Sequence, residues 1–442
     1  MQLASAIKVT HDGNHRVISP DQTYRRVRAL MDKIGVTDIL DMTDHDAVAI
    51  PVWSVWQFER DTSGRIVSYG KGTDSIQAQV SAMMEAIERY AAKQLPDTIK
   101  LSSFSAMKRK FPTLDPRIAA HAANSAFSEH AEIAWLPGTD LFSGEEQWVP
   151  ASCVLLHPTL QEPRLVPMRT SNGLASGNTL EEAVCHSLCE MIERDAWTLA
   201  WLRAVTIPHI RTVARRMVRH PGSSEWSDLT AEADLFPEID AVSLPDAARR
   251  LIGQFERAGV TVIVHEITSD IEIPTFLAVS TEIANDGNAL MCGGTGSHPH
   301  AEVAVIRAIT ECAQSRRIAL LGCRSEQKPG RSVDAWLLRQ QLFFAPTSHK
   351  KDFSSIATHH NRDILDDIKA MLSRLDSVGL DQAVAVDLTQ PEIGIPVVRV
   401  LIPGIEDWSA FGFAPQHCVL GHRGQKWVEA PPGAASTPTL HV

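Results

Sequence analysis

Acidic side chains recur at one spacing in three separate segments of the chain. The first segment, Ser81 to Arg89, reads S-x-x-x-E-x-x-E-R, and the second, His186 to Arg194, has the same E-x-x-E-R core. A looser third copy runs from Arg307 to Arg316 and contains Glu311 and Gln314. Residues three or four positions apart share one face of a helix, so each copy predicts a helix with a polar stripe. Because an internal repeat weighs more than a single motif, these segments are the strongest functional signal in the sequence.

Carboxylates brought together by three such helices would favour one kind of chemistry. Like-charged carboxylates a few ångströms apart cannot all stay ionised unless their pKa values rise, and a divalent cation relieves that repulsion. Oxygen ligands without thiolates favour Mg²⁺ or Mn²⁺ over zinc or copper. Mg²⁺ usually bridges protein carboxylates to the phosphates of a substrate, so the pattern also predicts a nucleotide. The glutamates concerned are Glu85, Glu88, Glu182, Glu190, Glu193 and Glu311.

Glycine-rich stretches precede each of the acidic segments. They are Gly70-Lys71-Gly72, Asn172 to Asn178, and Gly293 to Gly296. A glycine-rich loop that leads into a helix offers free backbone N–H groups and the positive end of the helix dipole to a phosphate. We therefore expect three loop–helix units that converge on one nucleotide site. The candidate cations, each of which alone would more often be a solvated surface charge, are Arg16, Lys71, Arg89, Arg194 and Arg316.

Other kinds of site fit the sequence less well. A di-iron bundle needs Glu-x-x-His, whereas Glu182 and His186 are four positions apart and the other two segments have no histidine at that place. No P-loop motif occurs, and a two-carboxylate glycosidase would leave the threefold pattern unexplained. Cys185 and Cys189 are one helical turn apart, but a metal site would want more ligands nearby, so we interpret them as small buried helix residues.

The composition is that of a globular protein. The chain has 442 residues, of which 44% are hydrophobic and 21% charged, enough to form a real core. A net charge of −11 without a basic run argues against general nucleic-acid binding. Seven cysteines without a C-x-x-C pair indicate reduced thiols, and no long apolar stretch predicts a signal peptide or a membrane span. These features together predict a cytoplasmic protein that binds neither nucleic acid nor membrane.

The pattern of apolar residues predicts an α/β fold in which β-sheets are covered by the three core helices. Hairpins are expected at 47–70 and 131–156, and further strands at 260–266, 274–282, 383–388 and 395–402. Helices are expected at 19–33, 75–93, 179–201, 245–258, 300–321 and 362–377. The acidic segments come from all thirds of the chain. We therefore expect one catalytic domain over residues 16–406, a surface excursion at about 325–360, and an extension over 407–442 whose last dozen residues are disordered.

In their order and spacing, the motifs together resemble the YcaO superfamily over roughly residues 16–406. The resemblance implies a YcaO-type fold and an enzyme that depends on ATP and Mg²⁺ and activates a peptide backbone amide. A nucleophile attacks the carbonyl carbon, the amide oxygen is phosphorylated, and phosphate then leaves. A Cys, Ser or Thr side chain as nucleophile gives an azoline, and a sulfur donor gives a thioamide. The resemblance rests on Ser68 to Gly72 with Ser81 to Arg89, Ser171 to Thr179 with Glu182 and Glu190 to Arg194, and His298-Pro299 before Glu311 and Gln314.

The resemblance also implies roles for individual residues, none of them a nucleophile. Arg16 and Thr23 match a basic residue that precedes a hydroxyl by seven positions in the family's first helix. Lys71 and Arg316 remain candidate cations for the nucleotide, and Ser81, Asn178 and Gln314 would contact ATP. The implied Mg²⁺ ligands are Glu85, Glu88, Glu182, Glu190 and Glu193.

The chain departs from azoline-forming members of the family at its C-terminus. Residues 431–442 lack the alternating P-x-P-x-P ending, whereas Ile395 to Glu406 is similar to members that work beside a TfuA-type protein and are associated with thioamides. The resemblance implies a homodimer. Because no leader-binding domain precedes residue 16, we expect a separate TfuA-like or E1-like partner that presents a precursor peptide. The alternative is a non-catalytic YcaO-like subunit that holds nucleotide or peptide, but the intact set of glutamates argues against it.

Overall fold

The fold is that of a computed structural model of the chain. It describes residues 1–11, 13–59, 64–119, 127–156, 170–203, 236–283, 289–322, 347, 349–407 and 421–429. Most of the predicted surface excursion and the last dozen residues lie outside these ranges, so neither prediction is tested.

Strands of the described residues form three sheets and a short ribbon. The N-terminal sheet has the order β3 (Val36–Asp41), β4 (Val52–Glu59), β5 (Gly64–Lys71). A second sheet has the order β13 (Ala289–Ser297), β12 (Thr275–Ile283), β11 (Thr261–Glu266), β10 (Glu238–Ile239), β14 (Lys350–Lys351). The third has the order β6 (Lys100–Ser103), β7 (Glu132–Asp140), β15 (Val384–Asp387), β16 (Val397–Leu401), β9 (Leu174–Ser176), with β8 (Glu146–Pro150) also on β7. The ribbon joins β1 (Val9–His11) to β2 (Asn14–Arg16).

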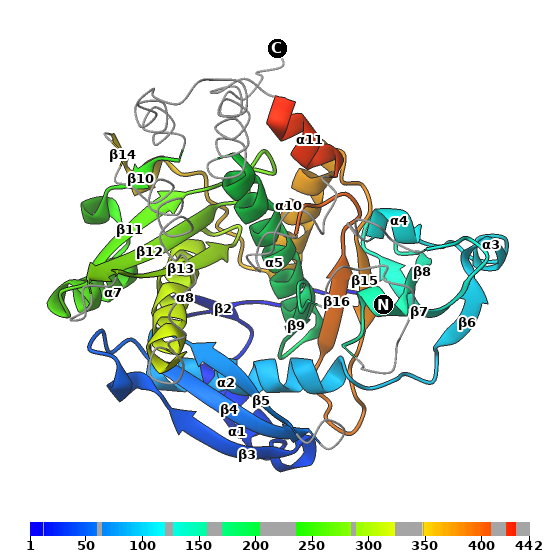
Figure 1. Cartoon of the computed structure of the whole chain (residues 1–442), viewed down its shortest axis with the longest axis horizontal. Coiled ribbons are helices and arrows are strands. Elements are labelled where there is room, and N and C mark those ends of the chain that lie inside the picture. The colour runs from blue at the N-terminus through cyan, green and yellow to red at the C-terminus, as the bar shows by residue number, and fades with distance from the viewer. Residues whose placement is uncertain are drawn as a thin grey trace, which may run out of the picture.

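Three long helices lie where these sheets meet (Figure 1). They are α2 (Ser75–Ala91), α5 (Leu180–Trp201) and α8 (Ala301–Gly322), and they contain the three acidic segments. Helix α2 packs on β4 and β5, α8 packs on β12 and β13, and α5 lies between the second and third sheets, in contact with both β13 and β16 (Figure 1). These three helices therefore begin and end within about two residues of the predicted positions, and they cover sheets as expected.

Helix caps and apolar stripes explain where these helices begin and what they bury. Thr179 caps α5 by accepting the N–H of Glu182, and Asp74 caps α2 by accepting the N–H of Gln77. On α2 the buried face includes Met83 and Ile87, both almost without solvent exposure. Burying side chains of this size stabilises the fold by roughly 2 kcal/mol each.

The remaining helices surround this centre. Helix α1 (Pro20–Arg28) begins at a capping box formed by Ser19 and Gln22 and ends before the predicted limit, being followed by a short 3₁₀ turn at Asp32–Ile34. The others are α3 (Phe104–Met107), α4 (Pro116–Ala119), α7 (Asp246–Arg257), α10 (Ile364–Ser377) and α11 (His422–Glu429). Among the described residues, no helix is both long and apolar enough to cross a membrane.

Two of the three predicted glycine-rich loops are in fact strands that touch a helix. A Cβ atom on Gly70 of β5 would lie 2.1 Å from the backbone N of Ala82, and one on Gly294 of β13 would lie 2.1 Å from the backbone N of Cys312. The third stretch contains the short strand β9, and there a Cβ on Gly177 would lie 2.5 Å from the N of Ala183. The glycines are therefore required because strand and helix backbones come into direct contact.

Helix α11 lies beyond residue 406, where the sequence places an extension, and is anchored to the core. The guanidinium of Arg423 donates to Asp195 of α5 at 2.8 Å and to Asp270 at 2.5 Å. The N–H of Gly424 donates to the side chain of Glu406 at 2.9 Å. These buried contacts hold α11 against one end of α5 (Figure 1).

Candidate nucleotide and metal site

The three acidic helix faces meet in one cavity of about 420 Å³. Six carboxylates from α2, α5 and α8 line it, Glu311 among them. Of the residues assigned from the sequence, those that line the cavity are Arg16, Thr23, Lys71, Ser81, Glu85, Glu88, Arg89, Asn178, Glu182, Glu190, Glu193, Arg194 and Gln314. The structure thus brings together side chains from β2, α1, β5, α2, α5 and α8.

Backbone N–H groups position the two carboxylates of α2. Glu85 accepts a hydrogen bond from the N–H of Tyr69 on the neighbouring strand β5, at 3.0 Å. Glu88 accepts both the N–H of Ser176 at 2.8 Å and its hydroxyl at 2.7 Å. Since Ser176 belongs to β9, the second of these carboxylates joins two of the repeated units.

The first carboxylate of α5 is held by three donors. Glu182 accepts the backbone N–H of Asn178 at 2.8 Å and its side-chain amide at 3.0 Å. It also accepts the N–H of Val17 at 2.6 Å, and Arg16 lies 3.7 Å away. The chain just before α1 is therefore fixed to the beginning of α5.

The remaining carboxylates are positioned by the same kind of contact. Glu190 accepts the N–H of Gly173 at 3.1 Å. Glu193 accepts the N–H of Ser297 at 3.1 Å and the hydroxyl of Thr295 at 2.7 Å, while Glu311 accepts the N–H of Thr295 at 3.4 Å. Because backbone donors cannot rotate away as side chains do, all six carboxylates are held in place before any ligand binds.

Cations compensate only part of this negative charge. Arg194 lies 3.3 Å from Glu190 and 3.2 Å from Glu193. Arg89 lies 2.7 Å from Glu85, and Lys71 forms an ion pair with Glu311. Among the described residues, no cation pairs with Glu88. Its carboxylate depends on Ser176 alone.

Burial and mutual repulsion shift the proton affinities of these groups. Burial, opposed by Ser176 and reinforced by Glu85, raises the pKa of Glu88 to about 8. Burial also raises the pKa values of Glu190 and Glu193, against the opposing effect of Arg194. For Glu311, burial would raise the pKa, but Lys71 and Arg194 bring it below the ordinary value. The cluster around Glu88 therefore favours a proton or a metal cation at neutral pH.

The donor set fits a hard divalent cation and a nucleotide. The ligand atoms available are carboxylate oxygens, which suit Mg²⁺. In addition, Asn178 lines the cavity, and its side-chain carbonyl oxygen is buried without a hydrogen-bond partner. An unpaired buried acceptor costs free energy, so its position at this cavity indicates that a ligand satisfies it.

One assigned residue does not reach the cavity. Arg316 is buried on another side of α8, where it lies 3.1 Å from Asp46 and 3.0 Å from Glu282. Two residues after Gln314, its side chain points about 200° around the helix, away from the site. The prediction that Arg316 binds the nucleotide is therefore not supported, and its role is to pin α8 to the N-terminal part of the chain.

Several lining residues were not assigned from the sequence. Arg307 and His186 also lie on the acidic faces, one helical turn from Glu311 and from Glu182, so their spacing could have identified them. Ser176 and Thr295 could not be found in this way, because they lie on strands β9 and β13, which were not predicted from the sequence.

The two cysteines on α5 are buried, as expected. Their sulfur atoms and a ring nitrogen of His298 all lie within 4.8 Å of one another. However, Nδ1 of His298 accepts the N–H of His300 at 2.9 Å, so the neutral ring carries its proton on Nε2. A metal on Nε2 would have to displace that proton, which makes this cluster a poor metal site.

Comparison with known proteins identifies the class of protein. Residues 69–406 match the family described as YcaO cyclodehydratase, ATP- and Mg²⁺-binding. The chain belongs to this family. The predictions of a YcaO-type α/β fold and of ATP and Mg²⁺ as cofactors are thereby confirmed, whereas the roles of individual residues stay predictions.

Two relatives match this chain over most of its length. A protein of Methanothermobacter thermautotrophicus is 31% identical over 407 residues, which are 89% of this chain and 96% of the relative. A protein of Rhizobium leguminosarum bv. trifolii, named for its place in the tfuA 3′ region, is 31% identical over 405 residues, 89% of each chain.

Solved structures share the fold. YcaO from Methanopyrus kandleri, bound with AMPPCP and Mg²⁺, is 25% identical, with a TM-score of 0.71 over 94% of this chain and 99% of that one. A heterocyclase in complex with substrate and cofactor has a TM-score of 0.74 at 23% identity, over 94% of this chain and 56% of that one.

Proposed function

We propose that the protein is an enzyme that uses ATP and Mg²⁺ to phosphorylate the oxygen of a peptide backbone amide. A sulfur or oxygen nucleophile forms a bond to the carbonyl carbon, and the amide oxygen takes the γ-phosphoryl group while ADP leaves. The C–O bond then breaks and phosphate departs. A thioamide remains when the sulfur loses its proton to solvent, and an azoline remains when the side-chain nucleophile and the amide nitrogen each lose a proton. The observation that carries this proposal is the convergence of six positioned carboxylates from three helices on one cavity.

The chain's own residues would divide this work between them. The glutamates Glu85, Glu88, Glu182, Glu190 and Glu193 would hold Mg²⁺, which when bound neutralises charge on the phosphates. Lys71 and Arg16 would contact phosphate oxygens, and Ser81, Thr23, Asn178 and Gln314 would bind the rest of the nucleotide. Phosphoryl transfer needs mainly positioning and charge compensation, so no side-chain nucleophile is required.

We infer that the product is a thioamide rather than an azoline. Two observations support this choice: the sequence Ile395 to Glu406 resembles TfuA-associated members, and a relative with 31% identity is named for its place beside tfuA. A separate TfuA-like partner would then deliver the peptide or the sulfur, and the enzyme would act as a homodimer. An E1-like partner would instead favour azoline formation.

Measurement of ATP hydrolysis in Glu190→Gln tests the proposed function. We expect Mg²⁺-dependent turnover in the natural chain and a loss of at least a hundredfold in the variant, because Glu190 is one of the proposed metal ligands. Glu256→Gln, an exposed position on α7, is the matched control and should retain turnover. Full activity of Glu190→Gln would refute the metal role. Binding of ATP without any phosphate release, with partner and peptide present, would favour the non-catalytic subunit instead.

A further inference from the structure

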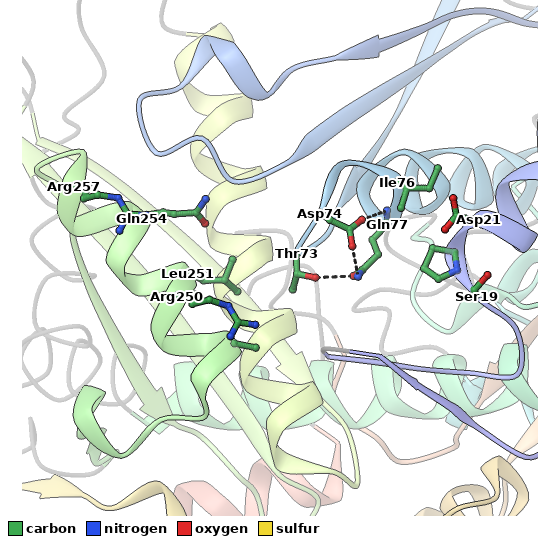
Figure 2. Close-up of a pocket in the computed structure, with 12 residues that line it drawn as sticks. Ser19, Asp21, Thr73, Asp74, Ile76, Gln77, Arg250, Leu251, Gln254 and Arg257 are labelled. Carbon is green, nitrogen blue, oxygen red and sulfur yellow. Dashed lines mark hydrogen bonds between the residues drawn. The ribbon is translucent and has the colours of Figure 1, made fainter.

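A second hollow, of about 780 Å³, lies beside the nucleotide cavity. Figure 2 shows its two walls: helix α7 on one side, and the first turns of α1 and α2 on the other. From α7 come Arg250, Leu251, Gln254 and Arg257, and across the hollow lie Asp21, Thr73, Asp74, Ile76 and Gln77 (Figure 2). We call this hollow the α7 groove.

The α7 groove adjoins the nucleotide cavity. Three residues, Pro20, Thr73 and Gln77, line both spaces. Two of them are tied together, since the Thr73 hydroxyl and the Gln77 side chain lie 3.1 Å apart. A molecule lying in the groove would therefore be separated from the nucleotide cavity by no more than these three residues.

The walls of the groove carry charges of opposite sign. Arg250 and Arg257 on α7 are seven positions apart and share one face with Gln254, which places their backbones about 10.5 Å apart along the helix axis. The opposite wall presents the exposed carboxylates of Asp21 and Asp74. A polyanion such as nucleic acid would be repelled by that wall, because its phosphates have one sign throughout.

The chemistry of an extended peptide fits these walls. About three residues of extended chain, at about 3.3 Å each, span the distance between the two arginines. Apolar surface from Ile76 would contact side chains, and the side-chain oxygen of Gln254, whose nitrogen donates to the carbonyl of Ala49, can accept a hydrogen bond from the peptide backbone. The amide that reacts must also lie near the phosphates, and the groove borders the cavity proposed to hold them.

We propose that the substrate peptide lies extended in the α7 groove, with acidic side chains against Arg250 and Arg257. This inference rests on the proposed function and adds a preference for the substrate: acidic residues beside the amide that reacts. The arginines then select the peptide by charge complementarity.

Selection from a displayed library of random 12-residue peptides tests the preference. The full chain serves as bait with Mg²⁺ and a non-hydrolysable ATP analogue present. We expect peptides that combine Asp or Glu with Lys or Arg in the natural chain, because the two walls differ in charge, and peptides without enrichment in Asp and Glu in the Arg250→Glu/Arg257→Glu double variant. Arg249→Glu, an exposed position on the same helix outside the groove, is the matched control and should keep the enrichment in Asp and Glu.

The outcomes separate this inference from the proposed function. The affinity of a selected acidic peptide should fall at least tenfold in Arg257→Gln, a variant that preserves size and polarity in case the charge reversals do not fold. The same enrichment in every variant, or no peptide retained by the natural chain, would overturn the inference. Binding of the ATP analogue to the natural chain is measured in parallel, and its absence would contradict the proposed function instead.

Discussion

Glu88 and Ser176 are 88 positions apart in the chain, yet the serine donates both its N–H and its hydroxyl to one oxygen of the glutamate. This contact joins α2 to β9 and holds a carboxylate that no cation pairs with in the described part of the chain. It shows how the repeated units make a site together: a strand of one unit positions the acidic side chain of another.

The variant Ser176→Ala should weaken Mg²⁺ binding. It removes the hydroxyl donor and leaves the N–H, so the charged form of Glu88 loses stabilisation worth about 1 kcal/mol, or roughly fivefold in affinity. Calorimetric titration of Mg²⁺ in the presence of an ATP analogue measures this effect. Ser377→Ala, at the end of α10, is the control, and equal affinities in the two variants would contradict the assigned role.

Glu88 should make the stability of the metal-free protein depend on pH. Its pKa of about 8 in the fold exceeds the ordinary 4.5, so the folded state holds a proton that the unfolded state releases. The contribution of Glu88 to the free energy of unfolding is therefore fully present below pH 4.5 and is lost as the pH rises through 8. The loss amounts to about a few kcal/mol at most. Urea unfolding at pH 6 and pH 9 measures the free energy of unfolding at each pH. Between these pH values Glu88→Gln should lose less stability than the natural chain. An identical loss in both proteins would show that Glu88 is not the cause of the pH dependence.

The close contact between β13 and α8 should tolerate no added methyl group at Gly294. A Cβ there would lie 2.1 Å from the N of Cys312, so Gly294→Ala should cost about 3 kcal/mol or more or prevent folding. The neighbouring Gly293 is a matched control, because its Cβ would meet nothing closer than 3.8 Å. Thermal unfolding of the two alanine variants measures the difference, and equal transition temperatures would disprove the packing account.

Arg26 should affect nucleotide binding without contacting the nucleotide cavity itself. It donates to the carbonyl of Asn178 at 2.8 Å and to that of Gly394 at 2.7 Å, so it fixes the turn that presents the unpaired Asn178 oxygen. We expect Arg26→Ala to raise the KM for ATP several-fold with a smaller change in kcat. Arg26→Lys should have a KM between those of the natural chain and Arg26→Ala. Steady-state kinetics test this against Arg25→Ala, an exposed neighbour on α1, which should leave KM unchanged.

The helices and their acidic faces were predictable because they depend on local periodicity. The stripe through Glu85 and Glu88 can be read from one segment, and so can its copy on α5. Strand β13 was not predictable, because Gly293 to Gly296 has low β propensity and its glycines are explained only by the helix against it. The donors Ser176 and Thr295, and the position of Arg316 on the far side of α8, depend on long-range packing that no spacing rule gives.

The most direct test of the proposed site is the position of the metal itself. A crystal of the full chain grown with AMPPCP and Mn²⁺ gives an anomalous signal that locates the ion without assumption. We predict a peak inside the cavity between α2 and α5, with carboxylate oxygens of the assigned glutamates at about 2.1 Å. A metal bound only by phosphate oxygens, or a peak outside the cavity while Glu88 and Glu190 keep only their present hydrogen bonds, would contradict the account.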